Sequence, residues 1–317
     1  MSDAVVISNV VKRYGSIAAV AGLSLRVPTG CIYGLLGPNG AGKTTTIRMV
    51  MSILVPDAGE IRLLGGHRAL EVKDRIGYLP EERGLYRKMT VDATLRYLAA
   101  LKGVPAGSIN ERIRAGLERV GLSAWRRKRV ETLSKGMAQK VQILSAVLHE
   151  PELVILDEPF SGLDPLNVEL VRELILSLRE RGATVILSTH QMEMAQRLCD
   201  RIVLISRGRA LAEGTPGEVR SQFAARTVVI EGEGDLRSVA ARVGAGRAVI
   251  AGSHAEFDLP EGANPDDILR TAMETVRISR FEVQRPDLQQ VFVRLVGADA
   301  ADDRAGSATP GAERAAV

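Results

Sequence analysis

The chain has 317 residues, of which 45% are hydrophobic and 25% charged. This composition is typical of a globular protein with about two domains. The net charge of +4 is small for this length and does not predict the concentrated basic face of a nucleic-acid binder. The two cysteines, Cys31 and Cys199, form no CxxC pair, which excludes a disulfide framework and fits a reducing compartment.

The start of the chain does not read as a secretory signal, because no apolar region follows a basic one. No window holds the roughly 18 consecutive apolar residues of a membrane-spanning helix. We therefore expect a protein that is soluble in isolation and that acts on a membrane, if at all, through another chain.

The first elements predicted are strands. Dense β-branched residues from Val5 to Val27, interrupted at Tyr14-Gly15, predict two antiparallel strands. Cys31 to Leu36 predicts a short strand that runs into a glycine-rich loop. Apolar residues at helical spacing then predict a helix from Lys43 to Leu54.

Helical patterns dominate from about Val91 to Leu148, with Ser134 as the expected N-cap of one helix. The apolar run Leu153 to Leu156 predicts a strand buried on both faces. Asp164-Pro165 predicts the start of the next helix, and Thr184 to Ser188 a further buried strand. This alternation indicates an α/β domain with a largely parallel sheet.

Three regions are predicted along the chain: an α/β domain at 1–222 with a helical subdomain at about 85–150, a small domain at 223–297, and a disordered tail at 298–317. The order of elements in the small domain, βαββαβ, predicts an α+β ferredoxin-like fold. Its predicted elements are Thr227–Glu231, Leu236–Val243, Arg247–Ala251, Ala255–Leu259, Asp266–Val276 and Arg277–Val283, followed by a last helix at Leu288–Val296.

A phosphate-binding (Walker A) loop follows the strand that ends at Leu36. The segment matches G-x-x-x-x-G-K-[ST] between a predicted strand and a predicted helix. Its backbone N–H groups and the helix N-terminus suit phosphate oxygens. We expect Lys43 to reach the β- and γ-phosphates and Thr44 to bind Mg²⁺. The predicted nucleotide-binding residues are Gly37, Pro38, Asn39, Gly40, Ala41, Gly42, Lys43, Thr44 and Thr45.

Two carboxylates, Asp157 and Glu158, follow the buried strand at Leu153 to Leu156. An acid pair at this position is costly unless a cation compensates it. Mg²⁺ is the cation that a phosphate loop brings, and we expect Asp157 to hold it through water. Glu158 is expected to polarise the attacking water. The alternative is that both carboxylates are helix caps or surface residues.

Further motifs resemble those of the ABC (ATP-binding cassette) ATPases, and the resemblance covers residues from about 4 to 220. Leu133-Ser134-Lys135-Gly136-Met137 is similar to the cassette signature, and Ser161-Gly162-Leu163-Asp164 to the D-loop. Ser188-Thr189-His190 is similar to the H-loop. Tyr14 stands where the family places an aromatic ring against adenine.

The resemblance implies a P-loop NTPase fold of the ABC cassette type, with a mixed sheet, an antiparallel β subdomain and a helical subdomain. It implies that the signature residues contact ATP bound by a second cassette; these residues are Ser134, Lys135, Gly136 and Met137. It also implies that His190 contacts the γ-phosphate, so that the catalytic residues are Lys43, Glu158 and His190.

Three positions depart from the family pattern. Glu81 stands where the family usually has glutamine, in the loop that couples cassette and membrane subunits; we name it as a candidate Mg²⁺ ligand beside Thr44 and Asp157. Lys135 replaces a signature glycine and either adds positive charge for the phosphate or faces solvent. Met137 replaces a glutamine, so that side-chain contact is lost.

The resemblance implies the ATP-binding and ATP-hydrolysing subunit of an ABC transporter, at the cytoplasmic face of the membrane, with ATP and Mg²⁺ as cofactors. It implies two partners: a second cassette, identical or paralogous, and a separate polytopic permease. The Pro-Glu-Glu-Arg-Gly-Leu-Tyr segment at 80–86 and the small domain resemble bacterial sodium- and drug-exporter-type cassettes, which implies an exporter.

The alternative function is a soluble ABC-type ATPase that acts on nucleic acid or ribosomes. Such proteins carry tandem cassettes or long coiled-coil insertions, and this chain has one cassette and no long heptad run. No nucleic-acid partner is therefore expected. Two further rivals are another P-loop enzyme, such as a GTPase or a small-molecule kinase, and a non-catalytic regulatory cassette.

Overall fold

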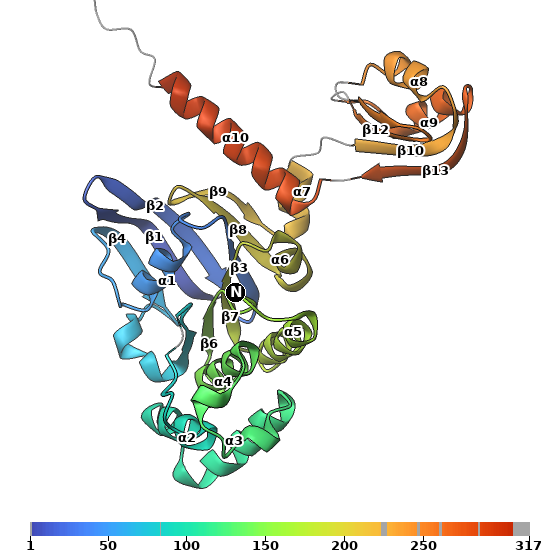
Figure 1. Cartoon of the computed structure of the whole chain (residues 1–317). Helices are drawn as coiled ribbons and strands as arrows, with labels where there is room; N and C mark the ends of the chain where they lie inside the picture. The colour runs from blue at the N-terminus through green and yellow to red at the C-terminus, as the bar shows by residue number, and fades with distance from the viewer. Residues whose placement is uncertain are drawn as a thin grey trace, which may run out of the picture. The chain divides into compact units, whose positions relative to one another are not determined.

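The computed structural model of the chain describes residues 2–82, 84–222, 227–245, 248–259, 262–284 and 286–306. It divides into two compact units, Met1–Thr215 and Pro216–Val317 (Figure 1). The strands of the first unit are β1 (Asp3–Tyr14), β2 (Ile17–Pro28), β3 (Ile32–Leu36), β4 (Ala58–Leu63), β5 (Ile76–Leu79), β6 (Leu153–Asp157), β7 (Thr184–Thr189), β8 (Arg201–Ser206) and β9 (Arg209–Gly214). Its helices are α1 (Lys43–Val50), α2 (Val91–Leu101), α3 (Ala106–Arg119), α4 (Lys135–Val147), α5 (Pro165–Glu180) and α6 (Met192–Leu198).

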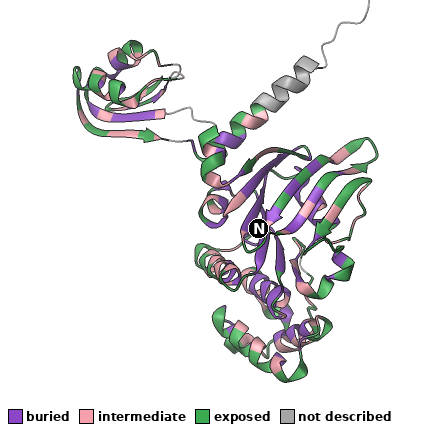
Figure 2. Ribbon diagram, turned by 180° about the vertical axis from the view of Figure 1, so that it is seen from behind, coloured by how far each residue is buried: buried purple, intermediate pink, exposed green. Residues whose placement is uncertain are grey.

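A six-stranded sheet forms the centre of the first unit, in the order β5-β6-β7-β3-β8-β9. All neighbouring pairs are parallel except β8 and β9. Strands β3, β6 and β7 are buried along their whole length, as Figure 2 shows in purple. Such strands are covered on both faces, which confirms the predicted largely parallel sheet.

A second sheet, antiparallel and in the order β2-β1-β4, packs on the first through a shared core. The hairpin of β1 and β2 closes where Tyr14 pairs with Ile17, as the break at Tyr14-Gly15 predicted. One hydrophobic cluster joins Val5 of β1, Ile47 of α1 and Ile155 of β6. Helix α1 is therefore held by both sheets, and this fixes the loop that precedes it.

The helical part of the first unit consists of α2, α3 and α4, which contact one another. In Figure 1, α2 and α3 lie at the end of the unit away from β1 and β2. Ser134 caps α4 because its hydroxyl accepts a hydrogen bond of 3.2 Å from the N–H of Met137. Mixed sheet, antiparallel sheet and helical part together confirm the predicted cassette fold.

The second unit contains β10 (Thr227–Gly234), α8 (Leu236–Arg242), β11 (Ala248–Ala251), β12 (His254–Asp258), α9 (Pro265–Met273) and β13 (Val276–Gln284), with α7 (Pro216–Gln222) before them and α10 (Leu288–Gly306) after them. The four strands form an antiparallel sheet in the order β11-β12-β10-β13. Helices α8 and α9 share one hydrophobic cluster with this sheet. Element order and strand order confirm the ferredoxin-like prediction.

Several predicted boundaries were wrong. Helix α1 ends at Val50 rather than Leu54, because Ser52 adopts a left-handed conformation (φ +54°) that stops the helix. Val276 belongs to β13, since α9 ends at Met273. Helix α7 groups with the second unit, where it contacts α10, and not with the first.

The last helix, α10, continues past the predicted end at Val296 as far as Gly306. Alanine has the highest helix propensity, and this segment is rich in it. Residues 307–317 of the predicted tail, Arg247 of a predicted strand and Arg83 of the 80–86 segment lie outside the described residues. Within the described ranges, no helix has the length and apolar character to cross a membrane.

Candidate functional site

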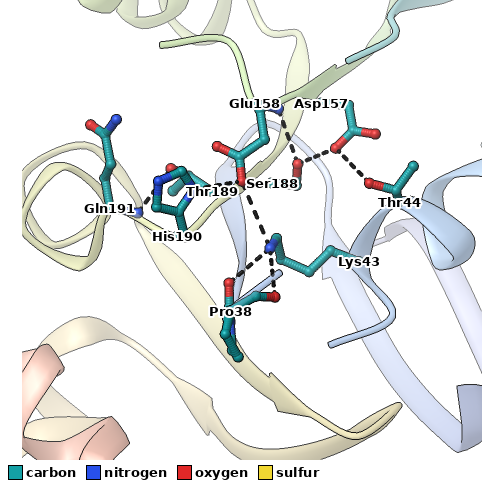
Figure 3. Close-up of polar contacts among 10 residues, drawn as sticks. Pro38, Lys43, Thr44, Asp157, Glu158, Ser188, Thr189, His190 and Gln191 are labelled. Carbon is teal, nitrogen blue, oxygen red and sulfur yellow. Dashed lines mark hydrogen bonds and ion pairs between the residues drawn. The ribbon is translucent and has the colours of Figure 1, made fainter. Parts of the chain in front are cut away.

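The central sheet brings three motifs to one edge. In the order β6-β7-β3, Asp157 pairs with Ser188, and Leu36 pairs with Thr189. Because these strands are parallel, their carboxyl ends lie together. The phosphate loop after β3, the carboxylates at the end of β6 and His190 after β7 therefore meet at this edge (Figure 3).

The phosphate loop needs glycine where it joins α1. Gly42 has φ +103°, and a Cβ added to it would overlap the carbonyl oxygen of Ala19. Lys43 is buried, and its ammonium donates hydrogen bonds to the carbonyl oxygens of Gly37 (2.7 Å) and Pro38 (3.1 Å). The same ammonium lies 3.7 Å from Glu158 Oε1. The loop thus places a cation directly beside the carboxylate.

Asp157 is fully buried at the end of β6. Its Oδ1 accepts hydrogen bonds from the hydroxyls of Ser188 and of Thr44, the latter at 3.4 Å. Burial raises the pKa of Asp157, and the neighbouring charges of Glu81 and Glu158 act in the same direction, while the two hydroxyls oppose them. This carboxylate is in an environment that favours a nearby cation.

Glu158 begins a turn in a left-handed conformation, with φ +50°. Its N–H donates to the carbonyl oxygen (3.2 Å) and hydroxyl (3.1 Å) of Ser188. Its Oε1 lies 3.0 Å from Nδ1 of His190, a half-exposed ring that reaches the site from the next strand (Figure 3). The predicted catalytic residues Lys43, Glu158 and His190 are thus in mutual reach.

Two buried carboxylate oxygens at this site, Asp157 Oδ2 and Glu158 Oε2, have no hydrogen-bond partner among the described residues. With the hydroxyl of Thr44 they form a set of oxygen donors, the ligands that Mg²⁺ prefers. No group of three or more His, Cys, Asp or Glu side chains able to hold a metal occurs in the described ranges. A metal that takes phosphate oxygens and waters fits such a sparse protein site.

The signature residues lie at the start of α4. Ser134 is exposed at the helix N-terminus, where backbone N–H groups suit an anion. Lys135 is also exposed, in line with the alternative that it faces solvent, and its side chain lies over Gly162, a contact that the sequence did not predict. Asp164 caps α5, because it accepts a hydrogen bond of 3.0 Å from the N–H of Asn167.

Two further predicted site residues, Tyr14 and Glu81, have exposed side chains. Tyr14 is 51% exposed at the end of β1, so its ring is open to a stacking partner. Glu81 follows β5 and is exposed, and its charge contributes to the raised pKa of Asp157.

Ser188 was named from the sequence only as part of the H-loop, and its own contribution to the site was not predicted. It is buried, and it bonds both to the carboxylate of Asp157 and to the backbone of Glu158. The available signal was a hydroxyl at the end of a buried strand, where a polar side chain needs a partner. Ser188 fixes the relative placement of the two acids.

Comparison with known proteins gives consistent matches. Residues 20–161 match the protein family described as ABC transporter, and residues 214–296 match the C-terminal domain of ATP-binding proteins similar to DrrA1-3. The chain is 39% identical to the uncharacterized ABC transporter ATP-binding protein YhaQ of Bacillus subtilis (strain 168), over 92% of this chain and 98% of that protein.

Two further similarities cover most of the chain. The Nod factor export ATP-binding protein I of Ralstonia nicotianae is 36% identical, over 92% of this chain and 93% of that protein. A solved ATP-binding subunit of an ABC transporter aligns with a TM-score of 0.65 and 33% identity, over 69% of this chain and 92% of that chain.

Proposed function

This chain belongs to the ABC transporter family as an ATP-binding subunit, and from that premise we propose that it hydrolyses MgATP between two cassettes to drive a separate permease. One observation carries the proposal: Lys43, Glu158 and His190 meet beside the phosphate loop, with distances of 3.7 Å and 3.0 Å from Glu158 Oε1. A loop cation, a base and a histidine in mutual reach suit phosphoryl transfer to water.

Phosphoryl transfer depends on positioning and on neutralisation of charge more than on covalent steps. The amides from Gly37 to Thr44 would cradle the triphosphate, and the ammonium of Lys43 would exchange the carbonyl of Gly37 for a phosphate oxygen. Mg²⁺, when bound, would neutralise charge on the phosphates. Thr44 and Asp157 would hold it, with Glu81 as a further candidate ligand.

Glu158 would act on the attacking water. Its left-handed backbone and its hydrogen bonds to Ser188 fix the side chain at the sheet edge. His190 holds the same carboxylate oxygen at 3.0 Å and would contact the γ-phosphate. Tyr14 would stack against adenine.

We assign the open side of the nucleotide to a second cassette. Ser134 and Lys135 are exposed at the N-terminus of α4, where backbone N–H groups suit an anion, and this helix start would contact ATP held by the partner. The D-loop, Ser161–Asp164, would lie at the same contact. ATP then joins two cassettes, identical or paralogous, and its hydrolysis releases them.

The permease would be a separate polytopic protein, with the cassettes at the cytoplasmic face of the membrane. Export is the proposed direction, supported by the similarity to a Nod factor export protein and by the DrrA-like C-terminal match. The relatives are transporter subunits, so the comparisons do not favour the nucleic-acid or ribosome alternative. Co-purification with a polytopic membrane protein, and not with nucleic acid, would support the transporter.

The catalytic assignment is tested with Glu158→Gln in the purified full chain. Loss of a positioned base costs about 10²- to 10⁴-fold in rate, so ATP hydrolysis should fall by that factor while ATP binding persists. Lys43→Ala is the matched control, since it should lose ATP binding itself. A Glu158→Gln variant that hydrolyses ATP at the wild-type rate would refute the assignment.

A further inference from the structure

One face of α4 lies against the turn that follows Glu158 in the same chain. A Cβ added to Gly162 would lie 2.5 Å from Nζ and 2.6 Å from Cε of Lys135. Gln139 donates a buried hydrogen bond of 3.3 Å to the carbonyl of Pro159. Lys135 and Gln139 are four residues apart, so they share one side of the helix.

Local helix physics does not explain a lysine at this position. A cation in the first turn opposes the helix dipole and costs about 0.3–1 kcal/mol. In the described part of the chain, the ammonium of Lys135 makes no hydrogen bond or ion pair. Its contact is with Gly162, which has a left-handed φ of +70°; Nζ, Cε and Cδ of Lys135 occupy the space that a Cβ there would need.

The turn that contains Gly162 is hydrogen-bonded to the backbone of Glu158. The N–H of Ser161 donates to the carbonyl oxygen of Glu158 at 3.1 Å, and the N–H of Leu163 donates to that of Phe160 at 3.3 Å. Phe160, which belongs to the same turn, is buried and so holds the turn on the core of the unit. A side chain that packs against Gly162 therefore restrains the turn that fixes the backbone position of Glu158.

We propose that Lys135 is a positioning residue whose aliphatic stem holds the D-loop turn against α4 and so keeps Glu158 in its catalytic geometry. The inference rests on the proposed function, because the start of α4 is also the surface assigned to the ATP of the partner cassette. Lys135 then links that surface to the base of its own cassette. The side chain performs this role through the space that it fills beside Gly162, and not through its charge.

Three variants of the full chain separate stem from charge. Lys135→Ala removes both and should lower kcat for ATP by about tenfold, equivalent to about 1.4 kcal/mol of barrier, with KM changed by less than about twofold. Lys135→Met keeps a stem of similar length and should lower kcat by no more than about twofold. Lys128→Ala, an exposed lysine of the same unit, is the matched control.

Amide hydrogen exchange gives a readout that is independent of turnover. The N–H groups of Ser161 and Leu163 should exchange faster in Lys135→Ala than in wild type and Lys135→Met. If Lys135→Met loses as much kcat as Lys135→Ala, or if both raise KM, the charge acts on phosphate and the inference is wrong. Unchanged kcat and exchange in Lys135→Ala would overturn it as well.

Failure of the proposed function would look different from failure of this inference. The wild-type chain would then not hydrolyse ATP, or Glu158→Gln would not lower its rate. The Lys135 comparison is interpreted only against a wild type whose turnover depends on Glu158.

Discussion

The hydroxyl of Ser188 offers the sharpest test of how the acid pair is held. Ser188→Ala removes a hydrogen bond that the buried carboxyl group of Asp157 accepts, and the loss of such a partner costs a buried polar group about 1–3 kcal/mol. In the variant, the N–H of Glu158 still donates to the carbonyl oxygen of Ser188 at 3.2 Å, so this N–H keeps a hydrogen-bond partner. Asp157 keeps only the longer bond from Thr44. The free energy of unfolding should therefore fall by about 2 kcal/mol.

Urea unfolding measures this change, since the single tryptophan, Trp125, lies in the first unit and reports on its unfolding. The midpoint should fall with the slope unchanged. Thr94→Val is the control: this threonine is buried in α2, and its hydroxyl has no hydrogen-bond partner among the described residues. A Ser188→Ala midpoint equal to that of wild type, or a Thr94→Val loss of the same size, would refute the reasoning.

Three other changes have defined outcomes. Tyr14→Ala should raise the KM for ATP by about tenfold, since base–aromatic stacking contributes about 1–3 kcal/mol. Tyr14→Phe keeps the ring and should retain the wild-type KM. Equal KM values in all three proteins would exclude stacking. Gly42→Ala should destabilise the first unit by about 3 kcal/mol, because it combines a strained φ of +103° with overlap on the Ala19 carbonyl. Thermal unfolding would show this loss as a lower Tm, and an unchanged Tm would contradict the prediction. Burial, followed by the charge of Lys102, lowers the pKa of His149 to about 4. Because the unfolded value is higher, at about 6.5, the stabilisation is complete above pH 6.5 and is lost as the pH falls toward 4. In His149→Leu, the free energy of unfolding measured with urea should depend less on pH between pH 7 and pH 4.5. An unchanged pH dependence would refute this prediction.

The buried strands and the phosphate loop could be predicted because their local patterns are strong. Strand β6 is a continuous apolar run, and the segment from Gly37 to Thr44 carries its own backbone requirements in its glycines. These predictions needed no knowledge of long-range packing. The place of His190 beside Glu158 was implied by the resemblance to the cassette family and not by the sequence pattern around it.

Other features depend on contacts that the sequence does not encode locally. Strand β4 is largely exposed, so it shows no apolar pattern and was not predicted. Lys135 lies over Gly162 because α4 packs on the turn after β6, and only the fold brings these segments together. Val276 was assigned to a helix because its apolar side chain suits either element, and pairing with Gly234 decided for the strand.

The central claim is that ATP joins two cassettes and that Glu158 activates the water that hydrolyses it. Size-exclusion chromatography of Glu158→Gln, with and without MgATP, tests this most directly. We predict a monomer without nucleotide and a stable dimer with MgATP, while the double variant Lys43→Ala/Glu158→Gln stays monomeric under both conditions. A Glu158→Gln protein that binds ATP and still elutes as a monomer would contradict the account.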